Sequence, residues 1–172
     1  MRPVSDLKIR IACRKFKRSV TVRKFVLVLL LSFMGLSSAW AEPRYAINGA
    51  EVYDSQTKLI WARCSVGQEW KDGHCVGTVT YFSFADAQKQ AGGEWRVPTK
   101  DELLSLVDKE RKSFPVVDTA AFPDMDANHP WYWSSSTNGE TIAWYVDFTD
   151  GYSSGFIAED NKLAVRLVRN GQ

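Results

Sequence analysis

The densest group of side chains with binding chemistry lies between residues 131 and 152, where aromatic residues crowd a short span. Five of them stand out: Trp131, Trp133, Trp144, Tyr145 and Tyr152. Successive side chains of a strand point to opposite faces of a sheet, so one set of rings is expected in the core and the other on the opposite face. Exposed flat rings stack against the apolar faces of sugars. Two interpretations follow: a platform that binds a glycan, or rings that protein covers on both faces.

Two charged residues belong to the same part of the chain. Asp147 lies in the alternating stretch 141–148, and Arg166 alternates with the apolar residues of the expected last strand. Opposite charges on neighbouring strands stabilise a sheet. We therefore expect Arg166 to pair with Asp147 across the sheet, either as a structural salt bridge or as part of a ligand site beside the rings.

Three oxygen-bearing side chains alternate just before the aromatic group. They are Asp124, Asp126 and Asn128. Calcium prefers carboxylate and amide oxygens. The segment lacks the glycine and the distal glutamate of an EF-hand, so a solvated acidic loop is the alternative. Calcium is the one cofactor that the sequence suggests.

Motifs for catalysis are missing from the sequence. It contains no Ser-His-Asp arrangement, no phosphate-binding glycine loop, no HExxH and no dinucleotide fingerprint. The two histidines, His74 and His129, offer little material for acid–base chemistry. We assign no catalytic residue and favour a non-catalytic module that binds a glycan or an envelope protein. The alternatives are an accessory structural envelope protein without a small ligand and, less favoured, a metal-dependent enzyme that uses the acidic loop.

The first 41 residues have the pattern of a signal peptide. The apolar run 25–36 is about 12 residues long, which is too short to span a bilayer, and Arg23 and Lys24 stand before it. Ala39 and Ala41 supply the small residues of a cleavage site after Ala41. We expect an exported protein of the periplasm, cell surface or medium, with no membrane span after cleavage; an uncleaved anchor is the alternative.

Charge divides unevenly between this leader and the rest of the chain. Residues 1–41 hold nine Lys and Arg and one acid, whereas residues 42–172 hold 13 bases and 19 acids, a net charge of −6. Nucleic acids are bound by clustered Lys and Arg that neutralise phosphates. The acidic balance after residue 41 therefore argues against a nucleic-acid partner.

Two of the three cysteines remain once the leader is removed. Cys64 and Cys75 are an even pair in an exported domain, which predicts a disulfide. His74 stands beside Cys75, but two cysteines and one adjacent histidine do not match a zinc spacing. A metal site and a Cys–His nucleophile pair are the minor alternatives.

The elements that position these residues indicate one α+β domain over residues 42–172. We expect a helix at 84–91 after the cap Ser83, and a second helix after Thr99, where Glu102 completes a capping box. Early strands are expected at 44–47, 51–54 and 59–63, the first ending at an Asn48-Gly49 turn. After a long loop at 113–130 we expect an antiparallel β-meander on which the helices pack, with strands at 131–135, 141–148, 152–157 and 163–167.

Several ordered motifs resemble one family. The segments that carry the resemblance are LIWAR at 59–63, GEWRVPTKDELLSLV at 93–107, VDTAAFP at 117–123, WYWSSS at 131–136, AWYVDF at 143–148 and VRLVR at 165–169. Over residues 52–169 the chain resembles the DUF1566 family, also called the Lcl C-terminal domain family. The resemblance implies an exported or surface protein.

The resemblance also suggests a fold and a ligand class. It implies a distant likeness to C-type-lectin folds and to the formylglycine-generating enzyme, whose catalytic cysteines have no counterpart here after Cys75. An adhesin of the family is associated with sulfated glycosaminoglycans, which it binds through a positive surface. The net charge of −6 over residues 42–172 departs from that pattern.

Overall fold

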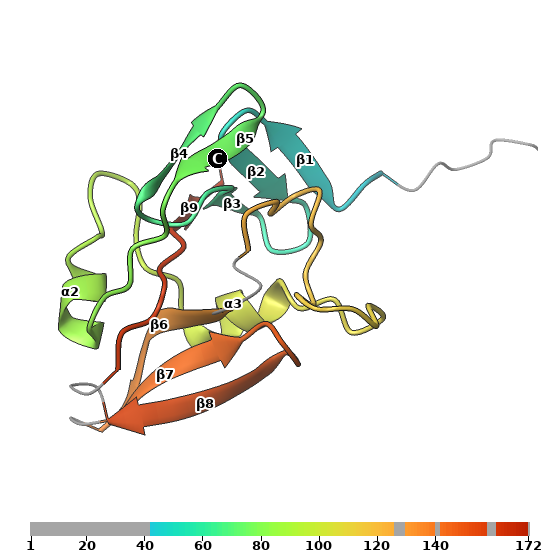
Figure 1. The fold of residues 1–172 in the computed structure, drawn as a ribbon. Helices are drawn as coiled ribbons and strands as arrows, with labels where there is room; N and C mark the ends of the chain where they lie inside the picture. The colour runs from blue at the N-terminus through green and yellow to red at the C-terminus, as the bar shows by residue number, and fades with distance from the viewer. Residues whose placement is uncertain (1–41, 126–129, 140–141, 158–160, 172) are drawn as a thin grey trace, which may run out of the picture. The chain divides into compact units, whose positions relative to one another are not determined.

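The first three strands and the last strand form one antiparallel sheet in the computed structural model, which describes residues 42–125, 130–139, 142–157 and 161–171. In spatial order the strands are β1 (Tyr45–Asn48), β2 (Glu51–Asp54), β3 (Leu59–Ala62) and β9 (Val168–Asn170) (Figure 1). Val52 pairs with Trp61, and both side chains are buried. One face of this sheet therefore forms a wall of the core.

The first hairpin turns one residue later than predicted. Asn48 pairs with Glu51, so the two loop residues are Gly49 and Ala50. Gly49 has a φ of 56°, a conformation that glycine adopts without a steric penalty. The predicted hairpin is confirmed, with its turn shifted.

The prediction of a last strand over 163–167 is wrong. The strand β9 begins only at Val168, and Leu163 and Ala164 make isolated bridges with Phe82 and Tyr132. Residues 163–166 are all buried rather than alternately buried. The apolar alternation misled because this segment crosses the core between elements instead of lying on a sheet with one open face.

A two-stranded hairpin that the sequence did not predict begins within the disulfide loop and extends two residues beyond Cys75. Its strands are β4 (Gln68–Lys71) and β5 (His74–Gly77), joined by a turn at Asp72-Gly73. The disulfide between Cys64 and Cys75 is confirmed and attaches this hairpin to the end of β3. Closing a loop of this size stabilises a fold by about 3 kcal/mol in the chain-entropy model.

Both predicted helices are present and short. The helix α2 (Phe84–Gln88) is capped by Ser83, whose hydroxyl accepts a hydrogen bond from the Asp86 amide. The helix α3 (Lys100–Ser105) begins with the predicted capping box of Thr99 and Glu102. Glu102 also forms a bidentate ion pair with Arg96, with two N–O distances of 2.7 Å. The start of α3 is therefore fixed by both backbone and side-chain bonds.

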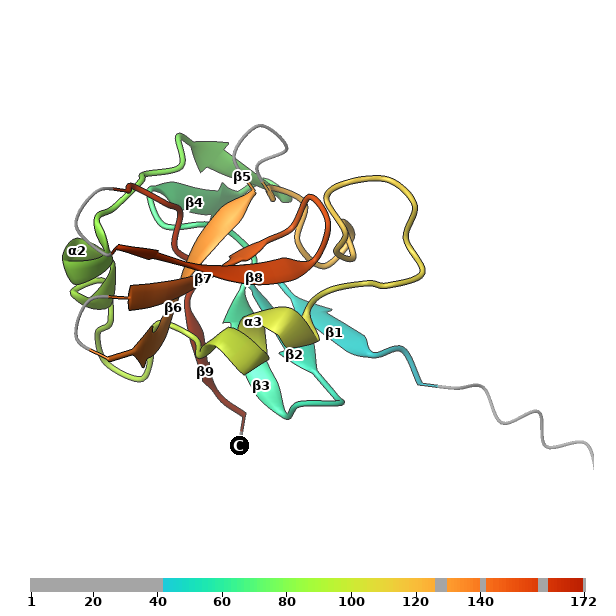
Figure 2. The same ribbon diagram turned by 90° about the horizontal axis from the view of Figure 1, so that it is seen from below.

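The second large sheet is the predicted antiparallel meander. Its strands are β6 (Trp131–Asn138), β7 (Ile142–Asp147) and β8 (Tyr152–Ile157), in that order. The helix α3 lies between this sheet and the first sheet (Figures 1 and 2). Helices packed on an antiparallel meander confirm the α+β class.

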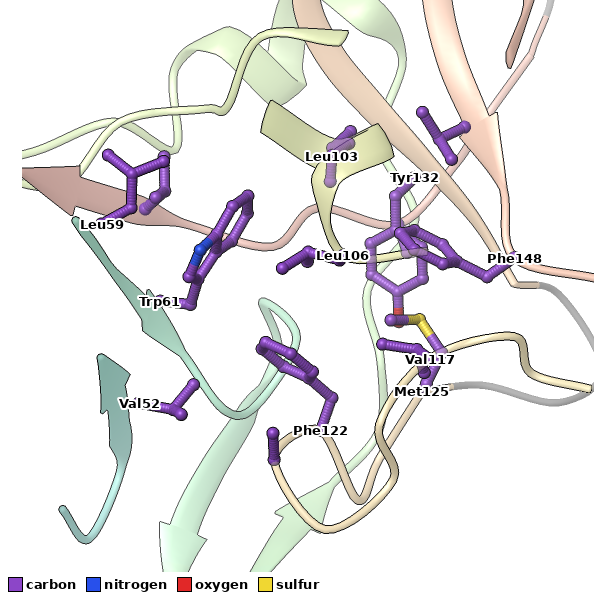
Figure 3. Close-up of a cluster of buried hydrophobic side chains, with 14 residues drawn as sticks. Val52, Leu59, Trp61, Leu103, Leu106, Val117, Phe122, Met125, Tyr132 and Phe148 are labelled. Atoms are coloured by element: carbon purple, nitrogen blue, oxygen red, sulfur yellow. The ribbon is translucent and has the colours of Figure 1, made fainter. Parts of the chain in front are cut away.

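The core consists of two clusters. The larger joins Trp61 of the first sheet, Leu103 and Leu106 near α3, and Tyr132 and Phe148 of the meander region (Figure 3). The long loop supplies Val117, Phe122 and Met125 to the same cluster. The smaller cluster lies on the other face of the meander, around Trp133, Tyr145 and Val165. Both faces of the meander are thus covered over part of their area.

The predicted signal peptide, residues 1–41, lies outside the described residues. Its cleavage after Ala41 therefore stays a prediction. Among the described residues, none of the helices has the length and apolar character needed to cross a membrane.

Candidate functional site

Three side chains form a row across the three strands of the meander. Trp131 of β6 pairs with Asp147 of β7, and Asp147 pairs with Tyr152 of β8. Directly paired residues of an antiparallel sheet point to the same face. The register therefore places a carboxylate between two aromatic rings, and we call Trp131, Asp147 and Tyr152 the aromatic row.

The aromatic row faces solvent. Trp131 is 38% exposed and Tyr152 is 74% exposed, while Asp147 is half-buried. The Oδ1 atom of Asp147 accepts a hydrogen bond of 2.7 Å from the Thr149 amide, which fixes its orientation. Among the described residues, its Oδ2 atom accepts no hydrogen bond. The row thus offers two flat apolar surfaces and one oriented acceptor.

Two further predicted residues lie on the same face but beneath protein. Trp133 is fully buried and Tyr145 is 8% exposed. The Trp133 indole donates a hydrogen bond of 2.8 Å to the Phe82 carbonyl oxygen, and its ring meets the edge of Phe84. The Tyr145 ring lies 6.0 Å from Trp131 and 6.4 Å from Trp133, between centroids. Tyr145 therefore contacts Trp131 from inside the domain, and both Trp133 and Tyr145 are buried in this structure.

Trp144 faces the opposite side of the meander. There the Nζ atom of Lys100, at the start of α3, lies 4.6 Å from its ring centroid. A cation over an indole face is a favourable contact. Trp144 therefore helps to attach α3 to the sheet and takes no part in the aromatic row.

Arg166 does not pair with Asp147, and that expectation is wrong. Its side chain is completely buried, and Nη2 lies 2.8 Å from the Oδ1 atom of Asp124. Its Nη1 atom donates to the carbonyl oxygens of Ala62 and Arg63. Arg166 lies in the crossing segment rather than in a regular strand, so its side chain enters the core instead of a sheet surface.

A hydrogen-bond network extends from Arg166 to the strand that carries Trp131. Nη2 of Arg166 donates to the Ser65 hydroxyl at 3.1 Å, and that hydroxyl lies 2.8 Å from the Tyr132 hydroxyl. Tyr132 is fully buried, and burial raises the pKa of its phenol. Ser65 and this role of Tyr132 were not singled out from the sequence, because the contact joins segments 67 residues apart.

Asp124 is the carboxylate of this network. Its Oδ1 atom accepts from Arg166, and its Oδ2 atom accepts from the Ser65 amide at 2.8 Å. Burial by itself raises the pKa of Asp124, but the Arg166 charge and the hydrogen bonds from Arg166 and Ser65 outweigh it and hold the pKa below its ordinary value. Asp124 therefore stays ionised at neutral pH.

The predicted calcium ligands are not brought together by the described residues. Asp126 and Asn128 lie outside them, and Asp124 is engaged with Arg166. In the part of the chain that the structure describes, no three His, Cys, Asp or Glu side chains form a group that could hold a metal ion. Calcium binding stays a prediction.

Comparison with known proteins places the domain in a family. No curated protein matches the chain. The family model of the Lcl C-terminal domain matches residues 50–169, a range that contains the aromatic row, both helices and the buried Arg166 network. Such a match indicates a surface-associated domain. The chain belongs to the Lcl C-terminal domain family.

Proposed function

We propose that residues 42–172 are an exported, non-catalytic binding module that recognises a glycan through the aromatic row. The observation that carries this proposal is the register of the meander, which sets Trp131, Asp147 and Tyr152 side by side on one face. Trp131 and Tyr152 are also among the large apolar side chains that remain exposed.

The chemistry of the row suits a sugar. A pyranose ring has an apolar face of C–H groups and an edge of hydroxyls, and the exposed rings of Trp131 and Tyr152 offer surfaces on which C–H faces can stack. The Asp147 carboxylate between them can accept hydrogen bonds from hydroxyls. A few polar groups among apolar ones are typical of sites that fix the orientation of a ligand.

The row stands on a rigid support. All three residues belong to paired strands, and the neighbour of Trp131 in the chain, Tyr132, is held by the buried network of Ser65 and Arg166. Sites on regular elements with fixed supports lose less entropy when a ligand binds. This support favours recognition without a large rearrangement.

Charge favours a ligand without sulfate. Residues 42–172 carry a net charge of −6, and the polar member of the row is itself an acid. We propose that binding does not require calcium, because both Asp124 oxygens accept hydrogen bonds from Arg166 and Ser65.

We further propose a C-type-lectin-like architecture and secretion. The first three strands and the last strand, β9, share one sheet, and the meander, whose strands come between them in the sequence, forms a separate sheet. This arrangement supports the likeness to C-type-lectin folds. The disulfide Cys64–Cys75 supports an oxidising destination. N-terminal sequencing of the protein from its native host should give Glu42 as the first residue.

A glycan array tests the proposed ligand class. The protein purified after expression of the full chain would be applied in calcium and again in EDTA, beside the double variant Trp131→Ala/Tyr152→Ala. The control is Ile142→Ala, which removes an apolar side chain of the same sheet that is 37% exposed, like Trp131, but lies outside the row.

We expect binding in both buffers, loss in the double variant and no change in the control. Binding that disappears only in EDTA would contradict calcium independence. It would instead support Asp124, Asp126 and Asn128 as calcium ligands. No binding to any glycan would contradict the glycan proposal and leave a protein partner as the alternative.

A further inference from the structure

The outer side of strand β8 is open. β8 is the last strand of the meander, and Figure 1 shows it at the margin of the sheet. Among the described residues, no backbone hydrogen bond or bridge reaches that side of β8. The opposite margin is covered, because β6 exchanges backbone hydrogen bonds with Ala164 and its Ser135 amide donates to the Pro98 carbonyl oxygen. Within the described chain, β8 therefore presents N–H and C=O groups to which a further strand can pair.

β8 lacks the features that usually keep an open strand from pairing. Edge strands of natural proteins are commonly very short or carry Lys, Pro or a bulge. Residues 152–157 contain no charged residue and no proline, and their register with β7 is unbroken. The register of β6 with β7, by contrast, shifts between Trp133 and Thr137. A regular strand of six residues is therefore left able to accept another strand.

A hollow opens beside β8 on the side of the meander where α3 lies. It has a volume of about 630 Å³, and its aliphatic lining comes from Leu104, Val107 and Val116, which are all half-buried. Ser153 of β8 also lines it. Because neighbouring residues of a strand face opposite ways, Ser153 faces away from the aromatic row, to which Tyr152 belongs. The hollow and the open edge of the sheet therefore meet at Ser153.

The side of the hollow next to β8 has a fixed shape. A Cβ atom placed on Gly151 would lie 2.5 Å from Cγ1 of Val107. Gly151 also has a φ of 80°, which favours glycine. The turn before β8 thus lies directly against the segment that follows α3. A hollow with such a wall is formed before a ligand arrives, which lowers the entropic cost of binding.

We propose that β8 accepts an extended peptide segment of a partner protein as a fourth strand of the meander, with an aliphatic side chain in the hollow. Directly paired residues of neighbouring strands point to the same face. The partner residue opposite Ser153 therefore points to the aliphatic lining. In such strand addition, backbone hydrogen bonds give affinity, and pockets for alternate side chains give specificity. The proposal adds a second ligand class and does not depend on glycan binding.

Charge indicates which residues flank that aliphatic side chain. The partner residue opposite Tyr152 extends the row of Trp131, Asp147 and Tyr152 by one position. A Lys or Arg there can lie over the Tyr152 ring, which is 74% exposed, near the exposed Asp150. The net charge of −6 over residues 42–172 attracts such a segment and repels a second copy of this chain. The partner segment therefore alternates aliphatic and basic residues.

NMR titration with synthetic peptides tests the proposal on the protein purified after expression of the full chain. The probe is a peptide with blocked ends that alternates Lys and Val. One matched peptide replaces Val by Ser, and the other replaces Lys by Glu. We expect the probe to shift the backbone amide signals of β8 most. We expect it to bind at least about tenfold more tightly than the Ser peptide and about fivefold more tightly than the Glu peptide.

Two proline variants assign binding to the open edge. Backbone N–H groups of successive residues point alternately to the two sides of a strand. One of Ser153→Pro and Ser154→Pro therefore removes an amide from the open side, and the other breaks a hydrogen bond with β7. Proline is tolerated only where the amide faces outward. The variant that keeps the wild-type melting temperature should weaken binding of the probe at least about tenfold.

A second pair of variants keeps the test decisive if neither proline variant folds. Val116→Thr adds a hydroxyl to the lining of the hollow at nearly unchanged volume. It should reduce the preference for the probe over the Ser peptide to less than about threefold. The control Val79→Thr makes the same change at a half-buried valine outside the lining of the hollow and should leave that preference unchanged.

Four results would overturn the proposal. They are no binding of the probe, equal binding of the Val and Ser peptides, shifts centred on another strand, and an affinity that survives both the tolerated proline and Val116→Thr. Light scattering on the free protein adds a further one: a dimer that the tolerated proline turns into a monomer would show that a second copy occupies the edge. The glycan array uses a different ligand, so its outcome is read separately from these.

Discussion

At the scale of single residues, the ion pair of Arg166 and Asp124 holds the segments behind the aromatic row together. Their side chains are 0% and 5% exposed, and the pair joins the crossing segment before β9 to the long loop. Arg166 also lies 5.1 Å from the Phe122 ring centroid. A buried charge that loses its partner is costly because it has no water to replace the contact.

Asp124→Ala should therefore destabilise the fold strongly. We expect the free energy of unfolding to fall by about 3 kcal/mol or more, because Arg166 is left buried and uncompensated. Urea unfolding followed by tryptophan fluorescence measures the change. The control Asp101→Ala removes a carboxylate that is 88% exposed and should change the value by less than about 0.5 kcal/mol. Equal losses in the two variants would contradict the role of the pair.

The same pair makes stability depend on pH in the acid range. The pKa of Asp124 is lower in the folded protein than its ordinary value of 3.8. The stabilisation is fully present above that ordinary value and is lost as pH falls through the folded pKa. Asp54, paired with Arg44, has a lowered pKa and contributes with the same sign.

We expect the urea midpoint of the wild type to fall between about pH 5 and about pH 2.5, and that of Asp124→Asn to fall less over the same range. If the urea midpoint of Asp124→Asn falls with pH as steeply as that of the wild type, the pKa of Asp124 is the same in the folded and unfolded states, and the prediction is wrong.

The partner of Arg166 shows what residue patterns leave undetermined. Alternation in the sequence indicated that Arg166 would point out of a strand toward Asp147. Its partner instead comes from a loop 42 positions earlier, and the contact exists only because that loop folds into the core. Spacing along the chain carries no information about such a pair.

At the scale of elements, the start of α3 is the best-defined local structure. The Thr99 hydroxyl accepts from the Glu102 amide at 3.2 Å, and the Glu102 carboxylate accepts from the Thr99 amide at 2.7 Å. Glu102 is held in turn by Arg96, and the contact of Lys100 with Trp144 attaches the helix to the meander.

Thr99→Ala should destabilise the domain by about 1 kcal/mol, because an amide at the helix start loses its acceptor. Thr99→Ser keeps the hydroxyl and should retain most of the stability. Thermal unfolding followed by circular dichroism compares the two variants. Equal melting temperatures for Ala and Ser would show that the cap does not stabilise α3.

Elements governed by local chemistry could be predicted from the sequence, and elements governed by tertiary contacts could not. Both helix caps depend on residues within a few positions of each other, and they were predicted correctly. The first hairpin was predicted as well, with its turn one residue early. The hairpin of β4 and β5 was missed because the polar sequence around Trp70 shows little alternation. That hairpin is fixed from outside: the disulfide holds β5, and the Arg63 guanidinium lies 4.0 Å from the Trp70 ring centroid.

At the scale of the whole molecule, the acidic balance of residues 42–172 determines how binding should respond to salt. A polyanion bound through basic side chains would dissociate as ionic strength rises. The aromatic row presents two neutral rings and one carboxylate. Salt ions screen interactions between charges, so they do not weaken the stacking of a neutral sugar on these rings.

Raising the salt concentration from about 0.05 M to about 0.5 M should therefore change the Kd for the glycan by less than about twofold. Titration calorimetry at both concentrations measures this. A Kd that weakens by tenfold or more would indicate an anionic ligand and a basic surface elsewhere on the domain.

Only the whole fold decides which aromatic residues form the candidate site. The sequence predicted that the rings would divide between two faces, and Trp144 does lie opposite Trp131. It could not show that Trp133, on the same face as Trp131, is covered by Phe82 and Phe84. Within strand β6, Trp133 is covered by these residues while Trp131 remains exposed, and the aromatic row exists because of this difference.

The most direct measurement of the central claim follows indole N–H signals by NMR while the glycan ranked first by the array is added. The signal of Trp131 is assigned by its loss in Trp131→Phe, and the fully buried Trp61 serves as the internal reference. Binding at the aromatic row predicts that the Trp131 signal shifts and saturates while the Trp61 signal stays in place. A glycan that binds without moving the Trp131 signal would contradict the assignment of this row as the binding site.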